Sequence, residues 1–126
     1  MEELMRNVII GDLLDIYGDL LTERQRRLLD MHYNQDWSLG EIAQQENISR
    51  QAVHDALGRG EKSLHELENT LHMLRILQTI RDTVPNIMQS VQRWHLDGRE
   101  KEEKNAVLKS MGKLLEIEGE EGIHGI

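Results

Sequence analysis

Apolar residues recur every three to four positions along most of the chain, which is the spacing of one buried helix face. The first predicted helix runs from Met5 to Gly18, where glycine favours a helix end. Its apolar face is expected to hold Val8, Ile9, Leu13 and Ile16. No segment alternates with the period of two that is typical of a half-buried strand, and we find no internal repeat. The pattern therefore predicts an all-α protein.

A capping box begins the second predicted helix. In the sequence TERQ, the Thr22 hydroxyl can accept a hydrogen bond from a free amide, while Gln25 reaches back to the backbone of the cap. We expect this helix to continue to about Tyr33, with Leu28 and Leu29 facing inward.

The next stretch has the layout of a helix-turn-helix, in which two helices are joined by a tight turn. A second capping box, SLGE, starts at Ser38, and Asn47 follows the short helix as a residue that tolerates the left-handed backbone of a sharp turn. Ser49 is expected to cap the second helix, and the small Ala43 lets the two helices cross closely. The remaining packing positions of this plan are filled by Ile42, Ile48, Val53 and Ala56.

Beyond Ser49 the apolar pattern extends to Ile80, which predicts a long helix. Gly58 and Gly60 interrupt this pattern, and each costs roughly 1 kcal/mol relative to alanine in a helix interior. We therefore expect a kink or a frayed joint near Arg59, which would divide the long helix in two.

Two more helices are predicted after this point. Pro85 is expected to begin the first of them, because proline suits the first turn of a helix but not its interior. Its apolar face before Gly98 would hold Ile87, Met88, Val91 and Trp94. The last helix is expected from about Arg99 to Ile117, with its inner positions at Val107, Leu108, Met111, Leu114 and Leu115. The final residues, EGEEGIHGI, lack periodicity and are expected to be disordered.

Length and composition limit the class of protein. The 126 residues fit one domain. We divide it into a helix-turn-helix part with its long following helix at 1–84, C-terminal helices at 85–118 that pack on it or form a dimer interface, and a disordered tail at 119–126. The chain has no Cys, which excludes disulfides and thiol catalysis and favours a reducing compartment. Without a signal-peptide pattern or a membrane-spanning segment, we expect a cytoplasmic protein that does not enter a membrane.

Motifs for catalysis and metal binding are missing from the sequence. We find no glycine-rich phosphate loop, no GxSxG and no nucleophile beside a base, so we expect neither an enzyme nor a cofactor. His65, Glu68 and His72 fall on one helix face, but no Cys or second inward carboxylate accompanies them. We interpret this group as solvated surface and expect no metal site.

The stretch LTERQRRLLDMHYNQDWSLGEIAQQENISRQAVHDAL resembles region 4 of bacterial sigma factors, in which LTxRQ and SLxEIA...SRxxV form the promoter-reading unit. The sequence is also similar to the YlxM-like family of small bacterial proteins, and this similarity extends into ENTLHMLRIL and AVLKSMGKLLEIE. The resemblance implies an all-α, cytoplasmic, DNA-binding protein with a sigma region 4-like helix-turn-helix extended by C-terminal helices. Genes of this family commonly lie beside that of the signal recognition particle GTPase, which implies a regulatory role in the signal recognition particle pathway.

The resemblance also implies which residues would contact nucleic acid. Carried over position by position, the second helix of the helix-turn-helix would present Ser49, Arg50, Gln51, His54, Asp55 and Arg59. Arg50 would pair with guanine and Gln51 with adenine in the major groove, and Ser49 would cap the helix and touch a phosphate. Contacts with the DNA backbone would come from the preceding helix, through Arg24, Arg26 and Arg27.

Charge argues against this assignment. The formal net charge is −8, and residues 38–62 hold three basic and four acidic side chains, whereas a DNA-reading head is usually basic. Asp55 on the exposed face would repel phosphates. Two functions therefore stay open: a regulator that binds duplex DNA, and an interaction protein whose acidic surface binds a basic partner such as the signal recognition particle GTPase. The same surface could instead contact structured RNA.

Two further features have alternative interpretations. The cluster of Arg24, Arg26 and Arg27 is either a phosphate clamp or a solvated helix face balanced by Glu23 and Asp30. The heptad spacing from Leu64 to Leu74 is most simply explained as core. It can also be interpreted as a homodimer interface, which would present two helix-turn-helix motifs to a palindromic DNA site.

Overall fold

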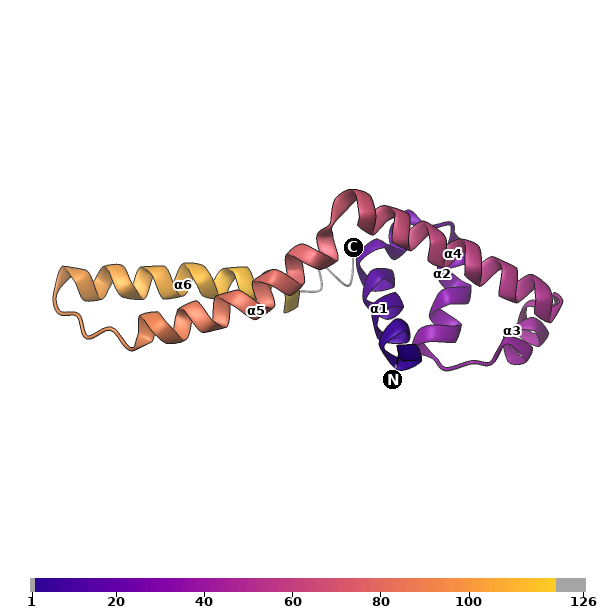
Figure 1. Cartoon of the computed structure of the whole chain (residues 1–126), viewed down its shortest axis with the longest axis horizontal. Helices are drawn as coiled ribbons and strands as arrows, with labels where there is room; N and C mark the ends of the chain where they lie inside the picture. Colours follow the sequence, from indigo (N-terminus) through magenta and orange to yellow (C-terminus); the bar gives the residue numbers. More distant parts are fainter. Residues whose placement is uncertain (1, 120–126) are drawn as a thin grey trace. The chain divides into compact units, whose positions relative to one another are not determined.

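The computed structural model describes residues 2–119, and this part of the chain is all-α, as the sequence predicted (Figure 1). Its elements are α1 (Glu2–Tyr17), the 3-10 turn η1 (Gly18–Leu20), α2 (Glu23–Leu29), the π-helical turn η2 (Asp30–Asn34), α3 (Leu39–Glu46), α4 (Arg50–Leu71), α5 (Met73–Gln92) and α6 (Arg99–Gly119). Gly119 is the last residue of α6, and the rest of the predicted disordered tail, 120–126, lies outside the described residues.

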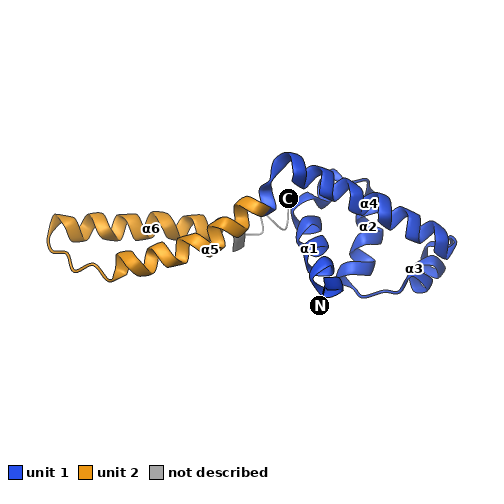
Figure 2. Cartoon of the chain, in the orientation of Figure 1, with its two compact units in different colours: residues 1–74 blue, residues 75–126 orange. Residues whose placement is uncertain are grey.

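The chain forms two compact units, residues 1–74 and residues 75–126 (Figure 2). The division therefore follows Leu74 rather than Val84, where the sequence suggested it. The reason is that the helix is interrupted at His72, which has a left-handed conformation with φ 57°, and not at Pro85. Within residues 2–119, no helix is both long and apolar enough to cross a lipid bilayer.

The core of the first unit is shared by α1, α2, α3 and α4. Leu28 and Leu29 of α2 face inward as predicted and are completely buried. The inner face of α1 differs from the prediction, because Val8 and Ile9 are exposed. The buried residues of α1 are Ile10, Leu13, Leu14 and Tyr17. They also recur at helical spacing, so periodicity alone could not select between two overlapping faces.

All three predicted caps are present in the first unit. The Thr22 and Ser38 hydroxyls accept backbone hydrogen bonds from Gln25 (3.1 Å) and Glu41 (3.1 Å), and both capping boxes are complete. The hydrogen bonds from Ser38, its backbone N–H first, hold the pKa of Glu41 below its usual value. Ser49 caps α4 by accepting from the N–H of Ala52 at 3.0 Å.

The second predicted helix has an irregular end. Regular α-helix stops at Leu29, and the chain continues to Asn34 as the π-helical turn η2, so helical backbone extends one residue past the predicted end at Tyr33. The Asp30 carboxylate accepts hydrogen bonds from the side chains of Asn34 (2.8 Å) and Gln35 (2.6 Å). These contacts close the turn locally.

The predicted kink near Arg59 is wrong, because α4 is continuous from Arg50 to Leu71. Gly60 is buried against α2, and a Cβ atom on it would lie 2.8 Å from Leu29 Cδ1. Glycine is needed there for the close approach of the two helices, and their packing offsets its low helix propensity.

The leucine heptads after Gly60 belong mainly to the core, which was the simpler interpretation. Leu64 is completely buried and Leu74 nearly so, whereas Leu71 remains 46% exposed. Homodimerisation stays a prediction.

The second unit contains α5 beyond Leu74 and α6, which turns back along α5 (Figure 1). Pro85 lies inside α5 instead of beginning a helix. The predicted start of α6 at Arg99 is confirmed. Lys104 Nζ donates to the carbonyl oxygens of Gln92 (3.1 Å) and Trp94 (2.7 Å) and so satisfies the C-terminal end of α5.

The apolar faces predicted for the second unit are only partly buried. Val91 is buried, and Leu108, Met111 and Leu115 are partly covered. The exposed members of these faces are Ile87, Trp94, Val107 and Leu114. Two helices alone cannot cover both of their apolar stripes, which explains the difference.

Candidate nucleic-acid interface

The helix-turn-helix comprises α3, the turn at residues 47–49 and α4. Asn47 adopts the predicted left-handed conformation, with φ 56° and ψ 46°. The Ile48 N–H donates to the Ala43 carbonyl at 3.1 Å, which closes the turn directly after α3. The predicted packing positions at Ile42, Ala43, Val53 and Ala56 are all buried. The inner face of the motif therefore matches its prediction.

The outer face of α4 holds three of the residues predicted to read bases or face them. Gln51, His54 and Asp55 are exposed, and their spacing of three and four residues makes them neighbours on the helix surface. Gln51 Nε2 donates to Asp55 Oδ1 at 3.0 Å, and His54 Nδ1 lies 3.6 Å from the same oxygen. Asp55 therefore contacts both neighbouring side chains. Its carboxylate accepts the hydrogen bond that the Gln51 side chain would otherwise donate to a base.

Two arginines flank this group. Arg50 lies in the first turn of α4, and Arg59 lies further along the same helix. Both side chains are exposed, and neither forms an ion pair with another described residue. They can therefore contact a ligand without first breaking an internal salt bridge.

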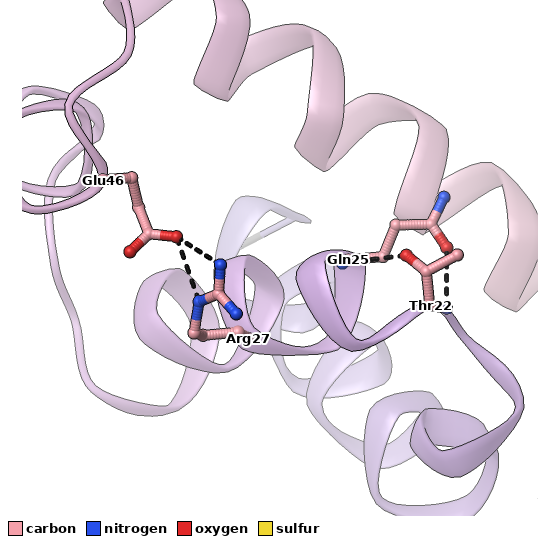
Figure 3. A network of polar contacts seen from close by, with 4 residues as sticks. All are labelled: Thr22, Gln25, Arg27 and Glu46. Carbon is pink, nitrogen blue, oxygen red and sulfur yellow. Dashed lines mark hydrogen bonds and ion pairs between the residues drawn. The ribbon is translucent and has the colours of Figure 1, made fainter.

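The arginine cluster of α2 is largely engaged by acidic residues. Arg27 donates from Nε (3.0 Å) and Nη2 (2.6 Å) to Glu46 Oε1, at the end of α3 (Figure 3). Arg26 pairs with Asp19 at 3.4 Å. Arg24 is exposed and forms no ion pair with another residue in the range 2–119.

The partners proposed from the sequence for this cluster, Glu23 and Asp30, are therefore replaced by Asp19 and Glu46. The Glu46 side chain is only 16% exposed, so its ion pair with Arg27 is partly shielded from solvent and ties α3 to α2. Sequence reasoning missed this pair because its members lie nineteen positions apart. The contact between Gln51 and Asp55 was accessible from the sequence, since the two residues are four positions apart on a helix.

The histidine group has no arrangement that suggests a metal site. Glu68 Oε1 accepts hydrogen bonds from the Tyr17 hydroxyl (2.7 Å) and the Leu74 N–H (3.0 Å). Across residues 2–119, no three His, Cys, Asp or Glu side chains gather closely enough to hold a metal ion.

The caps, the left-handed turn and the packed crossing of α3 and α4 define a helix-turn-helix protein. Comparison of sequences then identifies the family. Residues 4–107 match the UPF0122 family, described as "Putative helix-turn-helix protein, YlxM / p13 like", and the chain belongs to this family.

Relatives with similar sequences come from several bacteria. The UPF0122 protein of Clostridium kluyveri is 42% identical over 97 residues, which cover 77% of this chain and 85% of that protein. The UPF0122 protein of Lacticaseibacillus casei is 37% identical over 97 residues, covering 77% of this chain and 86% of the relative. A shorter match, 51% identity over 65 residues, covers 52% of this chain and 56% of the protein from Desulforamulus reducens.

Proposed function

We propose that this protein is a regulator that binds duplex DNA by inserting the outer face of α4 into the major groove. The observation that carries the proposal is a complete helix-turn-helix whose second helix has an exposed polar face. Such a helix fits the major groove, where the donor and acceptor pattern identifies each base pair.

Each side chain then has a distinct task. Arg50, in the first turn of α4, is suited to pair with guanine, and Gln51 to pair with adenine after it leaves Asp55. Ser49, His54 and Arg59 lie on or next to the same helix and would add contacts to phosphates or base edges. Arg24 is better placed for a phosphate contact than Arg26 or Arg27, because both of these would first have to leave a carboxylate.

Titration of a labelled mixed-sequence duplex, followed by fluorescence anisotropy at low and physiological salt, tests this function. Backbone contacts require the affinity to fall as salt rises. Arg24→Ala should weaken binding to all sequences and lower the salt slope by about one. Arg50→Ala should instead lose about tenfold on a selected site while changing binding to random duplex little.

The control for these variants is Arg93→Ala, which removes an exposed arginine from the second unit. The affinity of this variant for duplex DNA should equal that of the unchanged protein. If no duplex binds even at low salt, the proposed DNA function is wrong.

Asp55 provides a second test of the same function. Asp55→Asn removes a negative charge from the outer face of α4 and weakens the hold on Gln51 and His54. The affinity for duplex DNA should rise about fivefold. Glu100→Gln makes the same charge change in α6 and should have no effect. Equal gains in both variants would show that only total charge matters and would contradict the assignment of α4.

A second candidate function is a protein-interaction module that binds a basic partner, such as the signal recognition particle GTPase. It is favoured by the charge of the first unit, where residues 1–74 contain fourteen Asp and Glu but seven Lys and Arg. The test is titration calorimetry with the purified GTPase, with and without its RNA. Binding only in the presence of RNA would favour structured RNA as the ligand, and no heat of binding in either case would contradict this partner.

A further inference from the structure

A cleft of about 890 Å³ lies in the first unit, on a surface that the helix-turn-helix interface does not use. One wall is formed by α1 from Glu2 to Asp15, and the other is formed by η2 and the segment leading into α3. The volume falls within the range of sites that bind ligands or peptide side chains.

The cleft has an apolar strip that the fold leaves uncovered. Leu4 and Val8, one helical turn apart on α1, are 65% and 57% exposed and line the cleft. Every residue from Glu2 to Ile9 is exposed, so the fold leaves this half of α1 largely uncovered. Large apolar side chains that stay in contact with water at the rim of a polar cleft mark an interaction surface.

Trp37 forms the fixed side of the same cleft. Its N–H donates to the Met31 carbonyl at 2.9 Å, and its carbonyl accepts a hydrogen bond from His32 Nδ1 at 2.8 Å. The backbone of Trp37 is therefore held on both sides, and its partly buried ring also packs on the core. A tryptophan with a fixed backbone, in the same cleft as two exposed aliphatic side chains, is suited to hold an apolar anchor from a partner.

Carboxylates dominate the charged part of the lining, where Arg6 is the single Lys or Arg. The acidic residues are Glu2, Glu3, Asp12, Asp15 and Asp36. This charge repels the phosphates of nucleic acid and attracts lysine and arginine. The cleft therefore differs in electrostatic character from the outer face of α4, with its two exposed arginines.

We infer that this cleft is a docking site for a basic amphipathic segment of a partner protein. The apolar residues of the segment would contact Leu4, Val8 and Trp37, while its Lys or Arg side chains would face the surrounding carboxylates. Helices with one apolar and one basic face combine these two features. This inference rests on the second proposed function and assigns its place on the molecule.

The test uses Trp37 as its own reporter. In a Trp94→Phe background, Trp37 is the remaining tryptophan of the chain, because the sequence contains two. The probe is an acetylated and amidated peptide of repeated Leu-Lys-Lys-Leu-Leu-Lys-Leu units, which lacks tryptophan. Titration should shift the emission of Trp37 to shorter wavelength and saturate, as leucine side chains replace water at the ring. The same peptide with Glu in place of Lys, and a short DNA duplex, should leave the emission unchanged.

A matched pair of variants separates the cleft from overall charge. Asp12→Asn with Asp36→Asn removes two carboxylates from the cleft, and Asn also tolerates the positive φ of residue 36. This variant should bind the basic peptide about fivefold more weakly. Glu23→Gln with Glu100→Gln removes two carboxylates elsewhere and should bind it with unchanged affinity.

The outcomes separate the docking site from the second proposed function on which it rests. Equal weakening in both double variants would overturn the docking site but leave a partner attracted by the acidic surface. A shift of Trp37 emission by duplex DNA would also overturn it, in favour of nucleic acid. If the peptide does not bind at all and the purified GTPase shows no heat of binding, the docking site and the second proposed function both fail. Circular dichroism of each variant checks that its helices are intact.

Discussion

The inner and outer faces of α4 follow different rules. Along the inner face, Val53, Leu57 and Leu64 are buried against the other helices of the first unit. Along the outer face, Asp55 contacts Gln51 and His54, and within residues 2–119 no hydrogen bond or ion pair joins these three side chains to another element. Packing therefore explains the inner residues completely, whereas folding places no demand on the outer ones. The outer face is where binding has to be sought.

The two glycines of α4, one on each face, differ in the same way. A Cβ on Gly60 would press on the completely buried Leu29, while a Cβ on Gly58 would meet no atom within 4 Å. The packing against Leu29 thus explains why residue 60 is glycine. No such contact explains Gly58, which lowers helix stability at an exposed position beside Asp55 and Arg59.

The largest expected effect is the loss of Leu64 from the inner face. Leu64→Ala removes a completely buried side chain and should lower the free energy of unfolding by about 2–5 kcal/mol. His65→Ala, one position further along and exposed, should change it by less than about 0.5 kcal/mol. Urea denaturation followed by circular dichroism measures both. Similar losses would mean that the two faces of α4 are not distinct in this way.

The glycines should respond with opposite signs to the same substitution. Gly60→Ala should destabilise the protein by about 1 kcal/mol, because overpacking against Leu29 outweighs the gain in helix propensity. Gly58→Ala should stabilise it by about 0.5–1 kcal/mol. Thermal unfolding of the two variants, compared with the unchanged protein, gives the sign directly. Two stabilised variants would show that Leu29 has room to move.

The smallest expected effect on stability at neutral pH concerns the border between the two faces. There, tyrosines from other elements donate hydrogen bonds to α4. The Tyr33 hydroxyl donates to Glu61, and the Tyr17 hydroxyl donates to Glu68 at 2.7 Å. Burial first, and the hydrogen bond to a carboxylate second, raise the pKa of both phenols above the ordinary value of tyrosine. The folded state therefore holds these protons more tightly than the unfolded state.

The contribution of these phenols to stability is complete below the ordinary tyrosine pKa and is lost as the pH rises through the raised values. Urea midpoints measured from about pH 8 to about pH 11 should fall with increasing pH. The fall should be shallower for Tyr17→Phe with Tyr33→Phe, which removes both tyrosines of the chain. Identical slopes would mean that lysines alone cause the alkaline loss of stability.

The sequence predicted the helix-turn-helix well because its signals are local. Each cap depends on residues three positions apart, and the left-handed turn depends on Asn47 alone. The residues proposed for nucleic-acid contact lie on or next to the helices that the sequence predicted, for the same reason. Their pairing was predicted less well: Glu23 and Asp30 were suggested as balancing charges for the arginine cluster, whereas Arg27 pairs with Glu46, because residues so far apart in the chain give no signal.

The sequence by itself determined the all-α class, the helix starts at Ser38 and Ser49, and the exposed face of α4, since hydrogen bonds and helical periodicity within one turn are sufficient for these. Only the tertiary structure decided that α4 passes unbroken through Gly60, because that depends on contact with Leu29 of another helix. It also decided which face of α1 is buried and which arginines remain accessible, and it formed the acidic cleft beside Trp37. Each of these properties is set by residues that are far apart in the chain and meet only when the helices pack.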